Sequence, residues 1–126
     1  MLQRTIEEFG QRLGMPSLSL NDKGLAALDI DGSGRLSLEV TGAQDPKEML
    51  VYLTTPIPPH DDNLIERALS FAHYKKPKPY VISTGVYNEN LVITVRLAPQ
   101  EITAQNLENT AIYLLDVRKT ILEGGV

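Results

Sequence analysis

The sequence predicts an α+β fold, a sandwich in which an antiparallel, twisted sheet is flanked by helices. Apolar residues recur every three or four positions near both ends of the chain and in its middle, which indicates helices. Between these segments apolar and polar residues alternate, and turn-forming residues separate neighbouring runs, which is typical of hairpins. The expected order of elements is α-β-β-β-α-β-β-α, and 126 residues fit a single domain over 1–126.

The chain is predicted to open with an amphipathic helix. The apolar residues of its stripe are Leu2, Ile6, Phe9 and Leu13. Gly14 and Pro16 end this helix, because glycine favours the conformation that stops a helix and proline cannot continue one. Leu18 and Leu20 are candidates for an additional short strand before the turn at 21–24.

Three strands are predicted to follow this turn. Residues 25–30 and 36–40 form a hairpin around the turn at 31–34, whose glycines supply the positive φ that a tight turn requires. The second of these strands alternates apolar and polar residues, so one of its faces contacts water. Residues 49–55 form the third strand, which the prolines within 56–59 close.

The middle of the chain is predicted to form a second helix. Asp61 or Asp62 caps its start, because a carboxylate accepts hydrogen bonds from the free N–H groups there. Its apolar face is broad and runs over residues 64–75, and Pro77 and Pro79 stop it.

A second hairpin and a last helix complete the expected fold. Residues 80–87 and 91–97 pair around the turn at 88–90. Thr103 caps the last helix, whose apolar positions continue to the glycines that begin at Gly124.

Composition excludes several classes of protein. The formal net charge of −4 argues against binding dominated by phosphates, which requires clustered lysine and arginine. The chain has no cysteine, which excludes disulfides and thiol catalysis. No apolar run approaches the ~20 residues of a membrane span, and residues 1–10 do not resemble a signal peptide. We therefore expect a cytoplasmic protein that neither binds nucleic acid nor inserts into a membrane.

The segment 29–40 has a partial likeness to a calcium-binding loop. Asp29, Asp31 and Ser33 occupy the first three ligand positions, but Val40 stands where a bidentate glutamate is needed. Strand-like alternation on both sides also contradicts the helices that flank such a loop. We interpret this segment as a hairpin turn.

No pattern in the sequence indicates a catalytic, cofactor or metal site. His60 and His73 are the only histidines, and their spacing contains no short-range ligand pair. No serine lies in a nucleophile motif, and no glycine-rich loop joins a strand to a helix. We therefore expect no catalytic residue, no cofactor and no bound metal, although one sequence alone leaves a pair of acid–base carboxylates open.

The apolar residues of the middle helix and the late hairpin occupy more than one face. Val81 and Tyr87 lie on one face of the first hairpin strand, and Tyr80, Ile82 and Val86 lie on the other. Two interpretations stay open. Helices could cover both faces of the sheet, or a second copy or another protein could cover part of this surface. A self-complementary patch would give a two-fold dimer.

The chain resembles the small type III secretion chaperones of the Tir chaperone (CesT-like) family. The resemblance covers nearly the whole chain and includes the order of the elements. It rests on residues 13–20, 25–40, 64–69, 79–81 and 107–109. Residues 75–79 depart from the family pattern, since they contain more lysine and proline than expected there.

The resemblance implies an ATP-independent homodimer in the bacterial cytoplasm. Such a protein binds the extended N-terminal region of a secreted effector and keeps it soluble and competent for export. An alternative on the same fold is a partner-switching regulator of secretion genes. The resemblance implies effector contacts at Ile6, Phe9, Leu13, Leu18, Leu20, Leu36 and Leu38. It implies dimer contacts at Ile65, Leu69, Ala72, Tyr80, Ile82 and Thr84.

Overall fold

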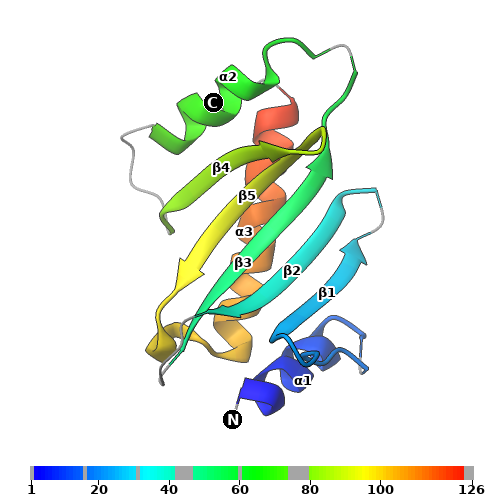
Figure 1. Ribbon diagram of the computed structural model, residues 1–126, viewed down its shortest axis with the longest axis vertical. Helices are drawn as coiled ribbons and strands as arrows, with labels where there is room; N and C mark the ends of the chain where they lie inside the picture. Colours follow the sequence, from blue (N-terminus) through cyan, green and yellow to red (C-terminus); the bar gives the residue numbers. More distant parts are fainter. Residues whose placement is uncertain are drawn as a thin grey trace.

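The computed structural model describes residues 2–15, 17–30, 32–41, 47–59, 61–73 and 80–123. The expected order α-β-β-β-α-β-β-α is confirmed (Figure 1). The elements are α1 (Leu2–Arg12), β1 (Leu25–Ile30), β2 (Gly34–Thr41), β3 (Glu48–Pro56), α2 (Leu64–His73), β4 (Ile82–Tyr87), β5 (Asn90–Leu97), a short 3-10 turn η1 (Pro99–Glu101) and α3 (Ala104–Leu122).

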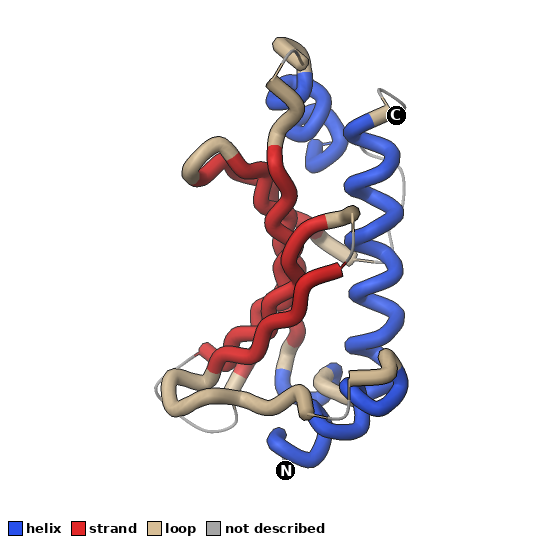
Figure 2. Tube along the Cα trace, turned by 90° about the vertical axis from the view of Figure 1, so that its right-hand side faces the viewer, coloured by secondary structure: helices blue, strands red, loops and turns tan. Residues whose placement is uncertain are grey.

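The strands form one antiparallel sheet in the order β1-β2-β3-β5-β4. Consecutive hairpins account for the pairs β1–β2, β2–β3 and β4–β5, whereas β3 and β5 pair across α2. The edges of the described sheet are therefore β1 and β4. Figure 2 shows α3 running along one face of this sheet, and among the described residues no helix covers the opposite face. The interpretation with helices on both faces is wrong for this part of the chain.

Strand alternation places the core between the sheet and α3. In β3 and β5 every second residue is buried, and the residues between them are half-buried or exposed on the open face. The buried residues of β5 are Leu91, Ile93, Val95 and Leu97, and those of α3 include Leu107, Leu114, Val117 and Ile121. Burying one such side chain contributes about 1.5–3 kcal/mol, so this layer supplies much of the drive to fold.

Local signals explain where the late elements begin and turn. The Thr103 side chain accepts a hydrogen bond from the Asn106 N–H at 3.0 Å, which confirms the predicted cap of α3. Asn88 and Glu89 have positive φ angles and form the turn between β4 and β5. Two such residues give a turn whose twist matches that of the strands it joins.

The expected short strand at Leu18 and Leu20 is wrong. Both residues lie in irregular backbone, with Leu18 buried and Leu20 half-buried. The Leu20 N–H donates to the side-chain oxygen of Gln3 at 3.2 Å, which holds this segment against α1. The segment therefore serves as packing between α1 and the sheet.

Candidate functional site

An apolar groove of about 330 Å³ lies between the end of α1, the β1–β2 hairpin and α3. Its lining residues are Leu13, Met15, Leu28, Asp29, Ile30, Leu36, Glu108, Ala111, Ile112 and Leu115. Leu13 and Met15 are 37% and 38% exposed, and Ile112 is 60% exposed. A cluster of exposed, large apolar side chains beside a groove is typical of a surface that binds another protein.

Two arginines tie the walls of this groove together. Arg12 at the end of α1 donates to the Gln105 side chain at 2.9 Å and lies 3.5 Å from a Glu108 carboxylate oxygen on α3. Arg118 of α3 donates to the Thr55 hydroxyl at 2.9 Å and to the Gly32 carbonyl of the hairpin turn at 3.2 Å. The groove is therefore formed before any partner binds, which lowers the entropic cost of binding.

The backbone N–H and C=O groups of successive β1 residues point alternately toward β2 and toward the free edge of the sheet. The Val40 N–H donates to the Gly24 carbonyl at 2.9 Å, so these opposed residues form a bonded pair. Bonded and non-bonded pairs alternate along an antiparallel ladder. Even-numbered residues of 24–30 therefore bond to β2, and the odd-numbered residues direct their backbone groups away from the sheet.

One of the three outward-directed residues is already bonded. The Leu25 carbonyl accepts from the Asn21 N–H at 2.8 Å, and the Leu25 N–H donates to the Asn21 side-chain oxygen at 3.1 Å. The backbone groups of Ala27 and Asp29 have no partner within the described residues. They lie directly beside the apolar groove, so the edge and the groove form one continuous surface.

A second apolar surface lies at the other edge of the sheet. Ile65 and Leu69 occupy the same face of α2, four residues apart, and each is 48% exposed. Val81, Val86 and Tyr87 are also exposed, and they lie on β4 or directly before it. Val86 is on the α3 side of the sheet and Val81 and Tyr87 are on the open side, so these apolar residues lie on both sides of the β4 edge. Figure 1 shows α2 and β4 at the same end of the molecule. We call these five residues the α2–β4 surface.

Arg67 fixes the position of α2. Its Nε donates to the Ile121 carbonyl near the end of α3 at 2.8 Å, and its two Nη atoms donate to the carboxylate of Asp61. These hydrogen bonds hold the pKa of Asp61 below its ordinary value of 3.8. The Asp61 carboxylate also accepts from the Asn63 backbone just before α2. The Asn63 carbonyl accepts the first helical bond, from the Arg67 N–H at 3.0 Å, so Asn63 holds the cap position and the prediction that Asp61 or Asp62 caps this helix is wrong.

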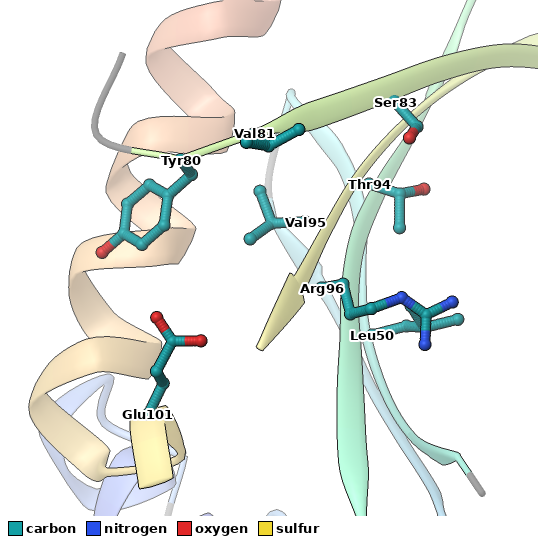
Figure 3. A pocket seen from close by; sticks show the side chains of 8 residues that line it. All are labelled: Leu50, Tyr80, Val81, Ser83, Thr94, Val95, Arg96 and Glu101. Atoms are coloured by element: carbon teal, nitrogen blue, oxygen red, sulfur yellow. The ribbon is translucent and has the colours of Figure 1, made fainter. Parts of the chain in front are cut away.

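A hollow of about 670 Å³ adjoins the start of β4 (Figure 3). Its two charged groups already have partners. Arg96 donates to Glu48 at 2.8 Å, and the Glu101 carboxylate accepts from the Ala98 N–H at 2.8 Å. The lining therefore offers no free charged group to a small molecule among the described residues. In the described part of the chain no group of three acidic, histidine or cysteine residues is placed to hold a metal, and no helix could span a membrane.

The calcium-loop interpretation finds no support in the local fold. The flanking segments are the strands β1 and β2 rather than helices, although Asp31 itself lies outside the described residues. The hairpin interpretation of this segment is confirmed.

Comparison with known sequences decides the family. The profile described as "Type III secretory system chaperone SycN" matches residues 1–122. The chain belongs to this family of type III secretory system chaperones. The predicted resemblance to type III secretion chaperones is thereby confirmed, with SycN as the matching family. No curated protein sequence gives a significant match.

Solved structures show that the fold is shared with other chaperones of this kind. The Yersinia pestis type III secretion chaperone SycH, in complex with a stable fragment of YscM2, has a TM-score of 0.71 and 18% identity, over 96% of this chain and 99% of that one. A chain of the ExsC–ExsE complex has a TM-score of 0.74 and 21% identity, over 94% of this chain and 88% of that one. A chain of the HopA1–SchA chaperone–effector complex has a TM-score of 0.70 and 18% identity, over 95% of this chain and 91% of that one.

In this SycN-family chain, most of the predicted effector contacts lie in the core. The buried ones are Ile6, Phe9, Leu18, Leu36 and Leu38. Leu20 is half-buried, and Leu13 is the most exposed of the set. Of the seven, Leu13 and Leu36 line the groove. A role in binding stays a prediction for all seven, and in the single chain the five that are buried offer almost no surface to a partner.

The predicted dimer contacts divide in the same way. Ile65 and Leu69 are exposed, whereas Ile82 is buried toward α3, and Thr84 lies half-buried on the same face of the sheet. The Tyr80 ring is half-buried and lies 5.3 Å from the ring of Tyr113 on α3. Ala72 is in α2, but its side chain lies outside the described residues.

Of the residues that line the groove, the predicted effector contacts included only Leu13 and Leu36. The exposed Met15 and Ile112 are among those that sequence reasoning missed. Met15 follows α1, where we expected only the end of a helix. Ile112 lies off the buried stripe of α3, one position after the buried Ala111. An isoleucine outside the buried stripe of an amphipathic helix is a usable signal for an exposed apolar site.

Proposed function

We propose that this chain is a type III secretion chaperone that holds the extended N-terminal region of a secreted effector. It works as a homodimer in the bacterial cytoplasm and needs no ATP. It keeps its effector soluble and competent for export. The observation that carries the proposal is the apolar groove, whose exposed side chains adjoin the free edge of β1.

The geometry suits an extended polypeptide better than a folded partner. A peptide strand that pairs with β1 meets the unbonded backbone groups of Ala27 and Asp29. Every second side chain of that strand then points into the groove. An effector segment without stable structure loses conformational entropy when it binds, and a preformed groove limits further losses on the chaperone side.

One of the similar structures supports an effector as the partner, since SchA was solved with HopA1 as a chaperone–effector complex. SycH was likewise solved with another protein bound, a fragment of YscM2. By analogy, we assign effector contacts in this chain to the exposed Leu13, Met15 and Ile112, of which Leu13 was predicted from the sequence. The buried Leu36, also predicted, forms the floor beneath them.

The α2–β4 surface is assigned to the homodimer. It combines an apolar helix face with a sheet edge, and a two-fold axis can make such a surface self-complementary. Figure 1 shows α2 at the opposite end of the molecule from α1, whose end borders the groove. Binding at these two surfaces makes or breaks no covalent bond, so we assign no catalytic residue.

The test is to purify the tagged chain from secreting cells and to identify what accompanies it. We expect an abundant secreted protein, attached through its N-terminal segment in limited proteolysis, with an affinity that ATP does not change. Ile112→Asp places a carboxylate in the groove and should abolish this complex. Asn109→Asp is the matched control, since it adds the same charge at an exposed position of α3 outside the groove lining.

Other outcomes would change the assignment. Capture of a protein that controls transcription would favour the partner-switching regulator. A complex that survives Ile112→Asp unchanged would show that the groove is not the binding surface.

A further inference from the structure

The free edge of β1 carries a charged residue between two apolar residues that line the groove. The Asp29 side chain is 83% exposed, and its one ion pair among the described residues is a loose contact of 3.8 Å with the exposed Arg35. Leu28 and Ile30, the neighbours of Asp29, both line the groove. Charge and apolar surface therefore alternate along this edge.

The sheet register determines where the side chains of an added strand point. Leu28 lies opposite Leu36, which is buried under the sheet on the side of α3. Asp29 lies opposite Arg35, which is exposed on the open face. On a strand that pairs with β1, residues opposite Leu28 and Ile30 therefore point into the groove. The residue opposite Asp29 points to the open face, next to its carboxylate.

The Asp29 carboxylate favours a cation at this position. The other charged residue of the lining, Glu108, belongs to the α3 wall, and among the described residues no lysine or arginine lines the groove. Arg12 is committed to Glu108 and Glu8, and Arg35 lies on the far side of Asp29 in the neighbouring strand. A carboxylate placed opposite Asp29 would meet a like charge directly across the strand pair, which is destabilising.

We propose that Asp29 selects effector segments of the pattern apolar–basic–apolar. The lysine or arginine of the segment pairs with the Asp29 carboxylate on the open face, and the two flanking apolar side chains enter the groove. Asp29 thus sets both the register and the charge of the bound segment. This inference rests on the proposed function, because it assumes that the groove binds an extended segment.

The test uses a display library of random nine-residue peptides selected against the full chain. Wild-type protein should enrich peptides with a basic residue between two apolar ones, and Asp29→Lys should enrich peptides with an acidic residue there. In a selected peptide, replacing the basic residue by glutamate should weaken binding to the wild type by roughly threefold to tenfold. Against Asp29→Lys the same replacement should strengthen binding.

Asp22→Lys is the matched control. It makes the same change in net charge at an exposed position in the turn before β1, outside the groove lining, and should keep the wild-type preference. Asp29→Asn should bind both peptides with similar affinity, because it has no charge at this position. Enrichment of acidic peptides by Asp29→Lys itself excludes misfolding of the lysine variant as the cause.

The outcomes separate the two claims. Suppose the selected peptides need Ile112 for binding, but the wild type shows no preference for a basic residue or Asp29→Lys keeps the wild-type preference. Either result would overturn the role of Asp29 and leave the groove in place as a binding site. If the library yields no peptide that Ile112→Asp loses, the groove itself fails as a binding site, and the inference fails with it.

Discussion

The α2–β4 surface makes a quantitative prediction about dimerisation. Ile65 and Leu69 each leave about half of their side chain in water in the single chain. Burying a whole side chain of this size contributes about 1.5–3 kcal/mol, so covering the exposed half contributes ~0.7–1.5 kcal/mol. A two-fold interface covers both residues on both protomers, and together they contribute ~3–6 kcal/mol.

The double substitution Ile65→Asp and Leu69→Asp removes this contribution and adds charges across the two-fold axis. Since each 1.4 kcal/mol changes an equilibrium constant tenfold, the dimer Kd should rise by about two to four orders of magnitude. Sedimentation velocity over a dilution series measures this shift directly. Both side chains face solvent in the monomer, so the monomer should keep its helical and strand signals in circular dichroism.

Ile112→Asp is the control for this experiment, because it places a carboxylate on an exposed isoleucine in the groove rather than on the α2–β4 surface. It should leave the dimer Kd unchanged. A double variant that dimerises as tightly as the wild type would refute the assignment of this helix face and move the interface elsewhere.

Three further predictions concern the stability of the fold. The Arg67 hydrogen bonds lower the pKa of Asp61, so the stability that they contribute is complete above the ordinary value of 3.8 and is lost as pH falls below it. The urea midpoints of the wild type and Asp61→Asn should therefore converge on acidification. A gap between the two midpoints that stays constant with pH would contradict this. Thr103→Ala should lower the free energy of unfolding by about 1 kcal/mol, while Thr103→Ser should retain most of it. Gly34 has a φ of +122° and no room for a Cβ beside β3, whereas Gly32 has open space around it. Gly34→Ala should therefore lower the melting temperature more than Gly32→Ala, and the reverse order would contradict this reasoning.

The sequence predicted the order of elements well because local chemistry encodes it. The apolar stripe that includes Ile6 and Phe9 has the spacing of a helix, which predicted α1. Thr103 marked the start of α3 because its hydroxyl accepts a hydrogen bond from a backbone N–H there. Leu18 and Leu20 misled the strand assignment, since alternation over three residues also suits a loop that packs two leucines inward. The Leu20 N–H bonds to the side chain of Gln3, a residue distant in sequence, rather than to a neighbouring strand.

The site was harder to predict because apolar periodicity does not say what covers a residue. Phe9 and Leu38 have the pattern of a partner-binding face, yet both are fully buried in the single chain. Whether a side chain is covered depends on where α3 crosses the sheet, and that crossing is set by packing between segments far apart in the sequence. Ile65 and Leu69 are exposed because α2 lies at one end of α3, where Arg67 holds it.

The position of α3 also affects how this protein folds during its own synthesis. The strands β1, β2 and β3 leave the ribosome soon after α1, but the helix that covers their apolar face follows only at residues 104–122. At about 5–20 residues per second, several seconds pass between the completion of β3 and the arrival of α3. During this interval Val51 and Leu53 lack the cover that they have in the finished molecule. The nascent chaperone therefore passes through a state with exposed apolar strands, and is itself prone to aggregate until its last helix closes the core.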